Sequence, residues 1–336
     1  MGRGPNNCLT DVRGLRVGGA VDETVRTGVT AVTADAPFVV AGDVRGGGPG
    51  TRETDLLRPS TLVDRADAIV LAGGSSYGLA AADGAAAVLG ARGRGFQLMA
   101  SPGVPPSPIV PAAILYDLAN GGDKNWGAEP PYAALGRRAV RDALDGPGGA
   151  CVLGRAGAGY GASAGDGAGG LGAASYVDGG ATVGALVAVN SFGAVRTPDG
   201  ASFWAAPFEI EGEFGGARAP ASAKPAAGLP PNTKLGPAAV GANTTIAIVA
   251  VDVSLSQADA ERIAIMAQDG LARAIRPVHG PTDGDVVFAL SVPPAEARNA
   301  APARQDPLTL TRLGAIAADC LARAVARGVY EAERSP

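Results

Sequence analysis

Residues 243–253 read NTTIAIVAVDV, and this stretch decides the fold. From Ile246 to Val253 it is almost continuously apolar and lacks the alternation of a strand with one face in water. Such a run predicts a strand covered on both faces. A second run of this kind, Thr182–Val189, ends at Asn190. The two runs together predict a sheet with covering layers on both sides.

The Asn243-Thr244 junction opens the first of these strands and carries a chemical signal. A threonine hydroxyl is a weak nucleophile, and the only histidine of the chain, His279, would have to activate it in a Ser-His type of triad. An N-terminal threonine needs no histidine, because its own α-amine, with a pKa of about 7.7 to 8, accepts the hydroxyl proton. The junction therefore predicts a self-cleaving precursor, which would be cut into residues 1–243 and 244–336.

An acidic pair, Asp283-Gly284-Asp285, follows this strand. Two carboxylates one residue apart lie on the same side of an extended segment. By itself the pair is typical of a solvated turn, and only its position relative to Thr244 makes it a candidate for the site.

Composition limits the other classes of function. At 336 residues the chain has room for one large α/β domain or two modest ones, with 46% hydrophobic residues to form a core. A net charge of −4 without a long basic run argues against a nucleic-acid or anionic-membrane partner. No uncharged stretch reaches the roughly 20 apolar residues of a membrane span, and a cytoplasmic location is expected.

The three cysteines, Cys8, Cys151 and Cys320, are an odd number and lie far apart without CxxC spacing. This pattern argues against a disulfide framework and against a zinc site. We expect buried thiols in a reducing compartment.

The rest of the chain alternates between predicted strands, helices and glycine-rich loops. Strands are predicted at residues 27–32, 39–44 and 68–71, helices at 79–89, 112–118, 256–274 and 307–330, and glycine-rich loops at 46–50 and 154–172. Glu209–Pro237 is charged and proline-containing, which indicates an exposed linker ahead of the cleavage point. Gly165-x-Gly167-x-x-Gly170 nominally fits a dinucleotide-binding fingerprint, but no clear helix follows it, so that function is not favoured.

Several longer blocks occur in a recognisable order. They are TDVRGLRVG (10–18), DVRGGGPGTRETD (43–55), AGGSSYGL (72–79), IVPAA (109–113), GGLG (169–172) and NTTI (243–246). The chain resembles the N-terminal-nucleophile hydrolases that include DmpA-type aminopeptidases, β-aminopeptidases and nylon-oligomer (6-aminohexanoate oligomer) endohydrolases. The Asn-Thr junction resembles the nylon-oligomer branch, because the DmpA-like peptidases carry Gly-Ser there.

The resemblance implies a fold and a set of roles. The fold would be an α/β four-layer αββα sandwich, formed by residues 1–336 as a single domain. Thr244 would form the acyl-enzyme, Asn190 would donate to the oxyanion, and Asp283 and Asp285 would orient the ammonium and hydroxyl groups of Thr244. Tyr116 matches a tyrosine of the site wall. Neither a metal nor an organic cofactor is implied, and the family suggests a homo-oligomer, a tetramer of cleaved protomers.

The implied reaction is hydrolysis of a small-molecule or peptide-like amide: linear aliphatic amide oligomers such as 6-aminohexanoate oligomers, or a natural peptide-like amide. One position departs from the family, which usually has a lysine in or just before the GGLG block, where this chain has Ala168. Arg155 is a poor substitute in proton transfer because it stays protonated. Two alternatives therefore stay open: an aminopeptidase of the DmpA or β-aminopeptidase type, and a ligand-binding relative without activity. An aminopeptidase needs an acidic group for the substrate ammonium, and the sequence assigns none.

Overall fold

A computed structural model describes residues 2–99, 101–218, 228–234, 243–297 and 304–335. Its strands are β1 (Leu15–Asp22), β2 (Thr27–Val44), β3 (Thr51–Arg52), β4 (Arg65–Ala72), β5 (Ala112–Ile114), β6 (Ser163–Ala164), β7 (Gly167–Ala168), β8 (Gly170–Asp178), β9 (Ala181–Asn190), β10 (Thr244–Val251) and β11 (Val286–Ser291). Its α-helices are α1 (Ala80–Ala91), α2 (Tyr132–Asp145), α3 (Gln257–Ala274) and α4 (Pro307–Arg334). Short 3-10 helices are η1 (Leu9–Asp11), η2 (Thr54–Leu57), η3 (Ser75–Leu79), η4 (Gly157–Gly159), η5 (Ala206–Phe208) and η7 (Ala295–Ala297).

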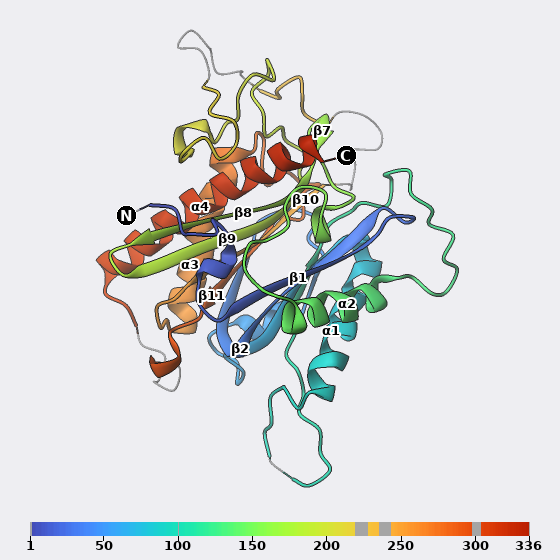
Figure 1. The fold of residues 1–336 in the computed structure, drawn as a ribbon, viewed down its shortest axis with the longest axis vertical. Helices are drawn as coiled ribbons and strands as arrows, with labels where there is room; N and C mark the ends of the chain where they lie inside the picture. Colours follow the sequence, from blue (N-terminus) through green and yellow to red (C-terminus); the bar gives the residue numbers. More distant parts are fainter. Residues whose placement is uncertain (1, 100, 219–227, 235–242, 298–303, 336) are drawn as a thin grey trace.

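A mixed sheet joins most of these strands, in the order β3-β5-β4-β2-β11-β10-β9-β8, with β1 paired to β2 (Figure 1). Strand β10 lies between β9, which is antiparallel to it, and β11, which is parallel. The long strand β2 has a register irregularity between Thr33 and Phe38. Before the irregularity β2 pairs with β1 and β4, and after it β2 pairs with β11 and, at Phe38 and Val39, still with β4. Strand β2 thus links the two halves of the sheet.

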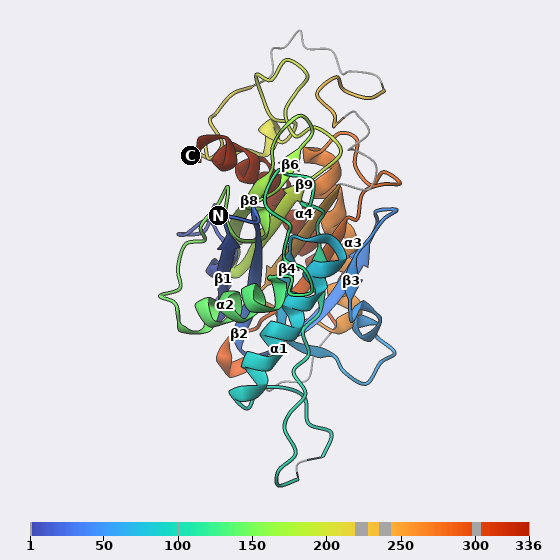
Figure 2. The same ribbon diagram turned by 90° about the vertical axis from the view of Figure 1, so that its right-hand side faces the viewer.

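Three apolar layers separate four layers of secondary structure. Helix α4 packs on β8 and β9, α3 packs on β11 and β2, α1 and α2 pack on β1, β2 and β4, and a middle core lies between the two halves of the sheet. The two helix pairs lie on opposite sides of the sheet in two perpendicular views (Figures 1 and 2). The arrangement confirms the predicted four-layer αββα sandwich.

The glycine-rich composition serves close packing of these layers. A Cβ at Gly84 of α1 would lie 2.0 Å from the carbonyl oxygen of Ala133, and one at Gly136 of α2 would lie 2.0 Å from that of Ala81. Only glycine permits this approach of two helix backbones.

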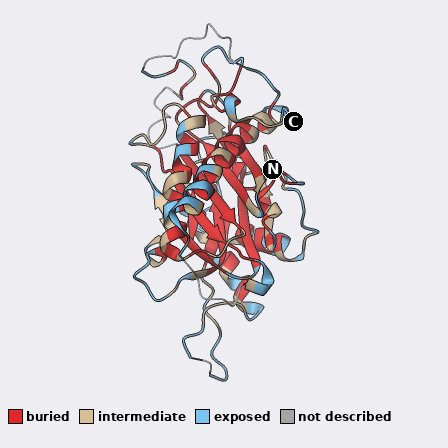
Figure 3. Cartoon of the chain, turned by 90° about the vertical axis from the view of Figure 1, so that its left-hand side faces the viewer, coloured by how far each residue is buried: buried red, intermediate tan, exposed pale blue. Residues whose placement is uncertain are grey.

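Strand β10 matches the prediction from its apolar run. Every residue of Thr244–Val251 is buried, and the burial map shows the sheet enclosed by partly exposed helices (Figure 3). Ala247, Val249 and Val251 belong to the core under α3 and α4, while Ile246 and Ile248 belong to the middle core. An uninterrupted apolar pattern is required because both faces are covered.

Two predicted segments are wrong. Residues 112–118 form strand β5 and a loop rather than a helix, because Ala112–Ile114 pairs in parallel with β4. The segment 154–172, predicted as a loop, contains β6, β7 and the first residues of β8. In both cases the pairing partner lies far away in the sequence, so local pattern carries no sign of it.

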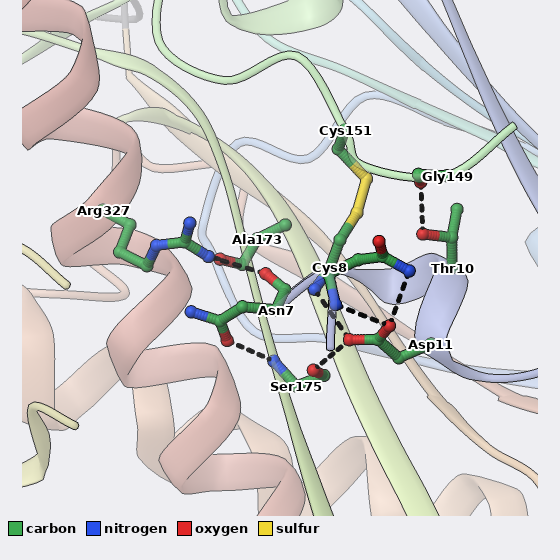
Figure 4. Close-up of a disulfide and its surroundings, with 10 residues drawn as sticks. Asn7, Cys8, Thr10, Asp11, Gly149, Cys151, Ala173, Ser175 and Arg327 are labelled. Atoms are coloured by element: carbon green, nitrogen blue, oxygen red, sulfur yellow. Dashed lines mark hydrogen bonds between the residues drawn. A yellow bond between two sulfur atoms is a disulfide. The ribbon is translucent and has the colours of Figure 1, made fainter. Parts of the chain in front are cut away.

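The prediction of three unpaired thiols is also wrong. Cys8 and Cys151 form a disulfide, while Cys320 is a free buried cysteine (Figure 4). The N-terminal segment is held beside β8 by Asp11, whose Oδ2 accepts the Ser175 hydroxyl at 2.6 Å. This anchoring brings Cys8 to the loop that carries Cys151. None of the helices in the described parts of the chain is long and apolar enough to cross a membrane.

Candidate active site

The predicted site residues meet at the same end of the neighbouring strands β9, β10 and β11. Thr244 begins β10 and lies directly opposite Asn190, the last residue of β9. Asp283 and Asp285 come just before β11, and Asn243 forms a parallel bridge with Asp283. Thr244, Asn190, Asp283, Asp285 and Asn243 are all at most 3% exposed. The structure thus brings together residues that are far apart in the sequence.

The peptide bond between Asn243 and Thr244 is held by two donors. The Thr244 hydroxyl donates to the Asn243 carbonyl oxygen, and the Gly284 N–H donates to the same oxygen at 3.2 Å. Gly284 also leaves room for the hydroxyl, because a Cβ there would lie 2.8 Å from Thr244 Oγ1. The carbonyl is therefore polarised at the bond where the sequence predicts cleavage.

Both side-chain oxygens of Asp285 contact neighbouring residues and hold them in place. Its Oδ1 accepts the backbone N–H of Thr245 at 2.8 Å, and its Oδ2 lies 2.8 Å from Nδ1 of His279 and accepts the His279 N–H at 3.1 Å. The carboxylate ties the second residue of β10 to the loop before β11. His279 contacts this positioning group, and its side chain is 20% exposed.

Asp283 has a raised proton affinity. It accepts N–H groups from Gly280 at 2.9 Å and from Phe192 at 3.3 Å. Burial, together with the charge of Asp285, raises the pKa of Asp283 to about 6. The Gly48 N–H donates to the Asp283 carbonyl oxygen at 2.8 Å, which confirms close backbone approach at the predicted loop 46–50.

Asn190 has a fixed orientation. Its Oδ1 accepts the Ser163 N–H at 3.0 Å, and its Nδ2 donates to the Tyr116 carbonyl oxygen at 2.9 Å. Only one orientation of the amide satisfies both bonds, so Nδ2 is the donor end. Tyr116, the predicted wall residue, lines the same pocket as Asn190.

Sequence reasoning missed Lys234. This residue lies in the predicted linker, but the described residues 228–234 are docked on the protein: the Lys234 N–H donates to the Phe192 carbonyl at 2.9 Å, and Nζ donates to the Ser163 carbonyl at 3.1 Å. Phe214 and Thr233 are also buried, whereas residues 211–212, 215–218 and 228–229 are exposed, so the prediction of an exposed linker is right for only part of the described segment. Residues 219–227 and 235–242 lie outside the described residues.

Lys234 places a cation where the sequence lacks the expected lysine. It lines a pocket together with Ala168, the position that departs from the family pattern, and with Arg155. Burial lowers the pKa of Lys234 to about 8, and the charge of Asp283 opposes this shift. The only sequence signal was a lysine close ahead of the cleavage point, which local pattern could not place in space.

The pocket has a volume of about 490 Å³. It is lined by Asn190, which lies opposite Thr244 in the sheet. Its wall comes from the turn after β1, the segment after β5, the β6–β7 hairpin and the segment that carries Lys234. The size is typical of a site for a small molecule or a short peptide.

Comparisons with known proteins show the family of the chain. The family model of peptidase family S58 matches residues 7–336. An uncharacterized aminopeptidase of Mycobacterium bovis is 44% identical over 345 residues, covering 97% of this chain and 94% of that protein. A 6-aminohexanoate-oligomer endohydrolase of Kocuria sp. is 31% identical over 326 residues, covering 94% of this chain and 84% of that protein.

Solved structures support the fold. A β-aminopeptidase of Burkholderia sp. superposes with a TM-score of 0.68 at 23% identity, covering 98% of this chain and 88% of that chain. The L-aminopeptidase D-Ala-esterase/amidase of Ochrobactrum anthropi, described as a variant of the Ntn hydrolase fold, gives a TM-score of 0.67 at 22% identity, covering 97% and 86%.

Proposed function

The chain belongs to peptidase family S58 and is an amide hydrolase, and we propose that its nucleophile is Thr244, released by self-cleavage at Asn243-Thr244. The observation that carries the proposal is the pair of hydrogen bonds from the Thr244 hydroxyl and the Gly284 N–H to the Asn243 carbonyl oxygen. Cleavage would divide residues 1–336 into fragments 1–243 and 244–336.

In the proposed cleavage, Thr244 Oγ attacks the Asn243 carbonyl carbon and the C–N bond breaks. The hydroxyl proton passes to the departing nitrogen, which leaves an ester between Asn243 and the Thr244 side chain. Water then hydrolyses the ester to the Asn243 carboxylate and a free Thr244 hydroxyl. The Gly284 N–H stabilises the oxyanion that forms during attack.

Turnover uses the same groups on a substrate amide. The Thr244 α-amine takes the hydroxyl proton while Oγ attacks the substrate carbonyl, and it returns the proton to the leaving amine as the C–N bond breaks. Water then hydrolyses the Thr244 ester, which releases the acid product and restores the hydroxyl. Asp283, whose backbone bridges to Asn243, is the carboxylate that we assign to stabilise the new ammonium group. Asp285 acts as a positioning residue through Thr245 and His279.

Two groups serve the substrate oxyanion in this proposal. Asn190 Nδ2 is a donor directly across from Thr244, and one such donor is typically worth about 3 kcal/mol. Lys234 provides a positive charge in the same pocket. Its presence favours a working enzyme over the ligand-binding relative, because the family lysine missing at Ala168 has a spatial replacement. No step requires a metal or an organic cofactor.

The substrates we favour are linear aliphatic amide oligomers of the 6-aminohexanoate type. The Kocuria sp. relative named as an endohydrolase of such oligomers supports this choice, as does the Asn-Thr junction. An aminopeptidase is the second candidate, because the relatives at 44% identity carry that name.

Intact mass spectrometry of the purified protein tests the proposal, with Thr244→Val and Thr245→Val as a matched pair. Both substitutions remove a hydroxyl from adjacent buried residues of β10 and keep the β-branched shape. We expect fragments 1–243 and 244–336 in the wild type and in Thr245→Val, and an uncut chain in Thr244→Val. An uncut wild type, or a cut Thr244→Val protein, would contradict the proposal.

A further inference from the structure

The pocket beside Asn190 is lined by more cationic than anionic side chains. Three cations, Arg26, Arg155 and Lys234, line it from three separate segments of the chain. Lys234 donates to a backbone carbonyl, but in the part of the chain that the structure describes neither arginine side chain has a hydrogen bond or an ion pair. Arg196, by contrast, is paired with Glu333 at 2.5 Å. Both arginine side chains are thus available to a ligand, and Arg155 also lines a second pocket beside β1 and α2.

The acidic groups of the pocket do not offset these charges. Asp117 is buried, with Oδ2 accepting the Thr27 hydroxyl at 2.6 Å and Oδ1 accepting the Gly74 N–H at 2.7 Å. Burial also raises the pKa of Asp117, which weakens it as a partner for a cation. Asp166 is exposed at the mouth. Of the two carboxylates in the described lining, Asp117 is thus held by Thr27 and Gly74, and Asp166 is exposed.

The backbone of Arg26 is fixed although its side chain is exposed. Its carbonyl oxygen accepts Nδ2 of Asn120 at 2.5 Å, and a Cβ at Gly161 would lie 2.1 Å from the same oxygen. Arg26 has a φ of 57°, in the left-handed region that favours glycine. An arginine is held there against local preference, and strain of this kind is common at functional sites.

We propose that Arg26 and Arg155 form an anion subsite that binds a free carboxylate of the substrate. The subsite rests on the proposed function, since it names the substrate class of the same active site: amides that carry a carboxylate, such as 6-aminohexanoate oligomers. An aminopeptidase would instead recognise its substrate by the free amine. The planar guanidinium group pairs with a carboxylate through two parallel hydrogen bonds, which gives both affinity and orientation.

Binding and hydrolysis can be measured separately. The binding probe is 6-acetamidohexanoate, which has a carboxylate and no amine, with its neutral primary amide as the comparison ligand. Ligand-observed NMR with the wild type should show the acid binding at least about tenfold more tightly than the amide, as expected for a charge-assisted bidentate contact. The preference should shrink in 0.5 M NaCl, because exposed charges are screened by salt.

The variants Arg26→Gln and Arg155→Gln should each lower the affinity for the acid about tenfold and leave the affinity for the amide unchanged. Arg304→Gln is the charge control: Arg304 is exposed and lies outside the pocket lining. Arg26→Gly removes the side chain and relieves the left-handed backbone, so it should unfold at no lower temperature than the wild type and still lose the acid preference. This variant separates a binding role from a folding role.

The outcomes separate the two proposals. Equal binding of acid and amide by the wild type, or an acid preference that survives Arg26→Gln with Arg155→Gln, would overturn the anion subsite. Hydrolysis of the 6-aminohexanoate dimer, its N-acetyl form and its C-terminal amide is measured in parallel. Loss of rate on C-terminal amidation but not on N-acetylation supports the subsite. If none of the three is cleaved although the acid binds selectively, the proposed substrate fails while the subsite stands.

Discussion

At the scale of single residues, the chemistry depends on two groups whose burial changes their proton affinity. The pKa of Asp283 is raised to about 6 and that of Lys234 is lowered to about 8. In the proposed roles Asp283 must be ionised and Lys234 must be charged. Both conditions hold together only between these two values, so the site works best near neutral pH.

The rate of substrate hydrolysis by the cleaved protein should therefore have an alkaline limb near pH 8, where Lys234 loses its charge. Lys234→Arg keeps the positive charge but does not titrate in this range, so this alkaline limb should disappear even if the maximum rate falls. Lys234→Met should hydrolyse substrate at least about tenfold more slowly below pH 8. Hydrolysis of the 6-aminohexanoate dimer is followed across this pH range, and an unchanged alkaline limb in Lys234→Arg would remove Lys234 from the mechanism.

Asp283 should also affect stability with a definite sign. Its folded pKa of about 6 exceeds the ordinary 3.8, so the folded state holds this proton more tightly than the unfolded state. The resulting stabilisation is fully present below about pH 4 and is lost as the pH rises through 6, by up to about 3 kcal/mol. Asp283→Asn cannot titrate and should lose less stability between pH 4 and pH 7.

Urea unfolding of the uncut Thr244→Val background, with and without Asp283→Asn, measures this difference without interference from cleavage. The Thr244→Val protein with Asp283 should show the steeper fall in free energy of unfolding between the two pH values. Parallel falls in both proteins would show that Asp283 has an ordinary pKa.

At the scale of elements, the loop 280–285 and the start of β10 form one unit. Gly284 combines two functions there: its N–H contacts the Asn243 carbonyl, and its lack of a side chain makes room for the Thr244 hydroxyl. Gly48, on the facing loop, has no such constraint, because a Cβ there would lie 3.8 Å from its nearest neighbours. Substitution of Gly48 therefore serves as the control for substitution of Gly284.

Gly284→Ala should slow self-cleavage at least about tenfold, since its Cβ displaces the hydroxyl or moves the N–H donor. Gly48→Ala should cleave at the wild-type rate. Time courses of fragment formation on denaturing gels compare the two, and equal rates would mean that the Gly284 contacts do not assist the reaction.

The sequence pattern predicted the strands that are buried on both faces and the helices whose N-terminus is capped. Strands β9 and β10 are apolar on both faces, and α3 begins where Ser256 accepts the Asp259 N–H at 3.2 Å. Pattern failed at β5, a three-residue strand that exists only because β4 and β3 pair with it. It also failed at Lys234, whose place in the site depends on docking of the segment 228–234 rather than on local preference.

At the scale of the whole molecule, fragment 244–336 is built into the fold. It contributes β10 and β11 to the middle of the sheet and α3 and α4 to one outer layer. A buried ion pair crosses the fragment boundary: Arg323 of α4 lies 2.5 Å from Glu213, and both side chains are at most 2% exposed. The resemblance predicted the layers, but the chain pattern gave no sign of this pair or of the Cys8–Cys151 link.

The two fragments should remain associated after cleavage and elute together in size-exclusion chromatography, separating only in denaturant. Glu213→Gln should lower the free energy of unfolding by about 3 kcal/mol, because it leaves the buried Arg323 charge without its partner. Exposed Glu211, which pairs with Arg3 at the surface, is the control, and Glu211→Gln should change stability by less than about 1 kcal/mol. Equal losses of unfolding free energy in the two variants would contradict the conclusion that the buried Glu213–Arg323 pair matters more than the exposed Glu211–Arg3 pair.

Covalent trapping tests the central claim, that Thr244 carries the acyl group, most directly. The cleaved protein is mixed with an activated ester of 6-acetamidohexanoate, quenched in acid within the first turnovers, and analysed by intact mass and peptide mapping. The account predicts one acyl group on fragment 244–336, located on Thr244. An acyl group on any other residue, or wild-type hydrolysis by a chain that has never been cut at Asn243-Thr244, would contradict it.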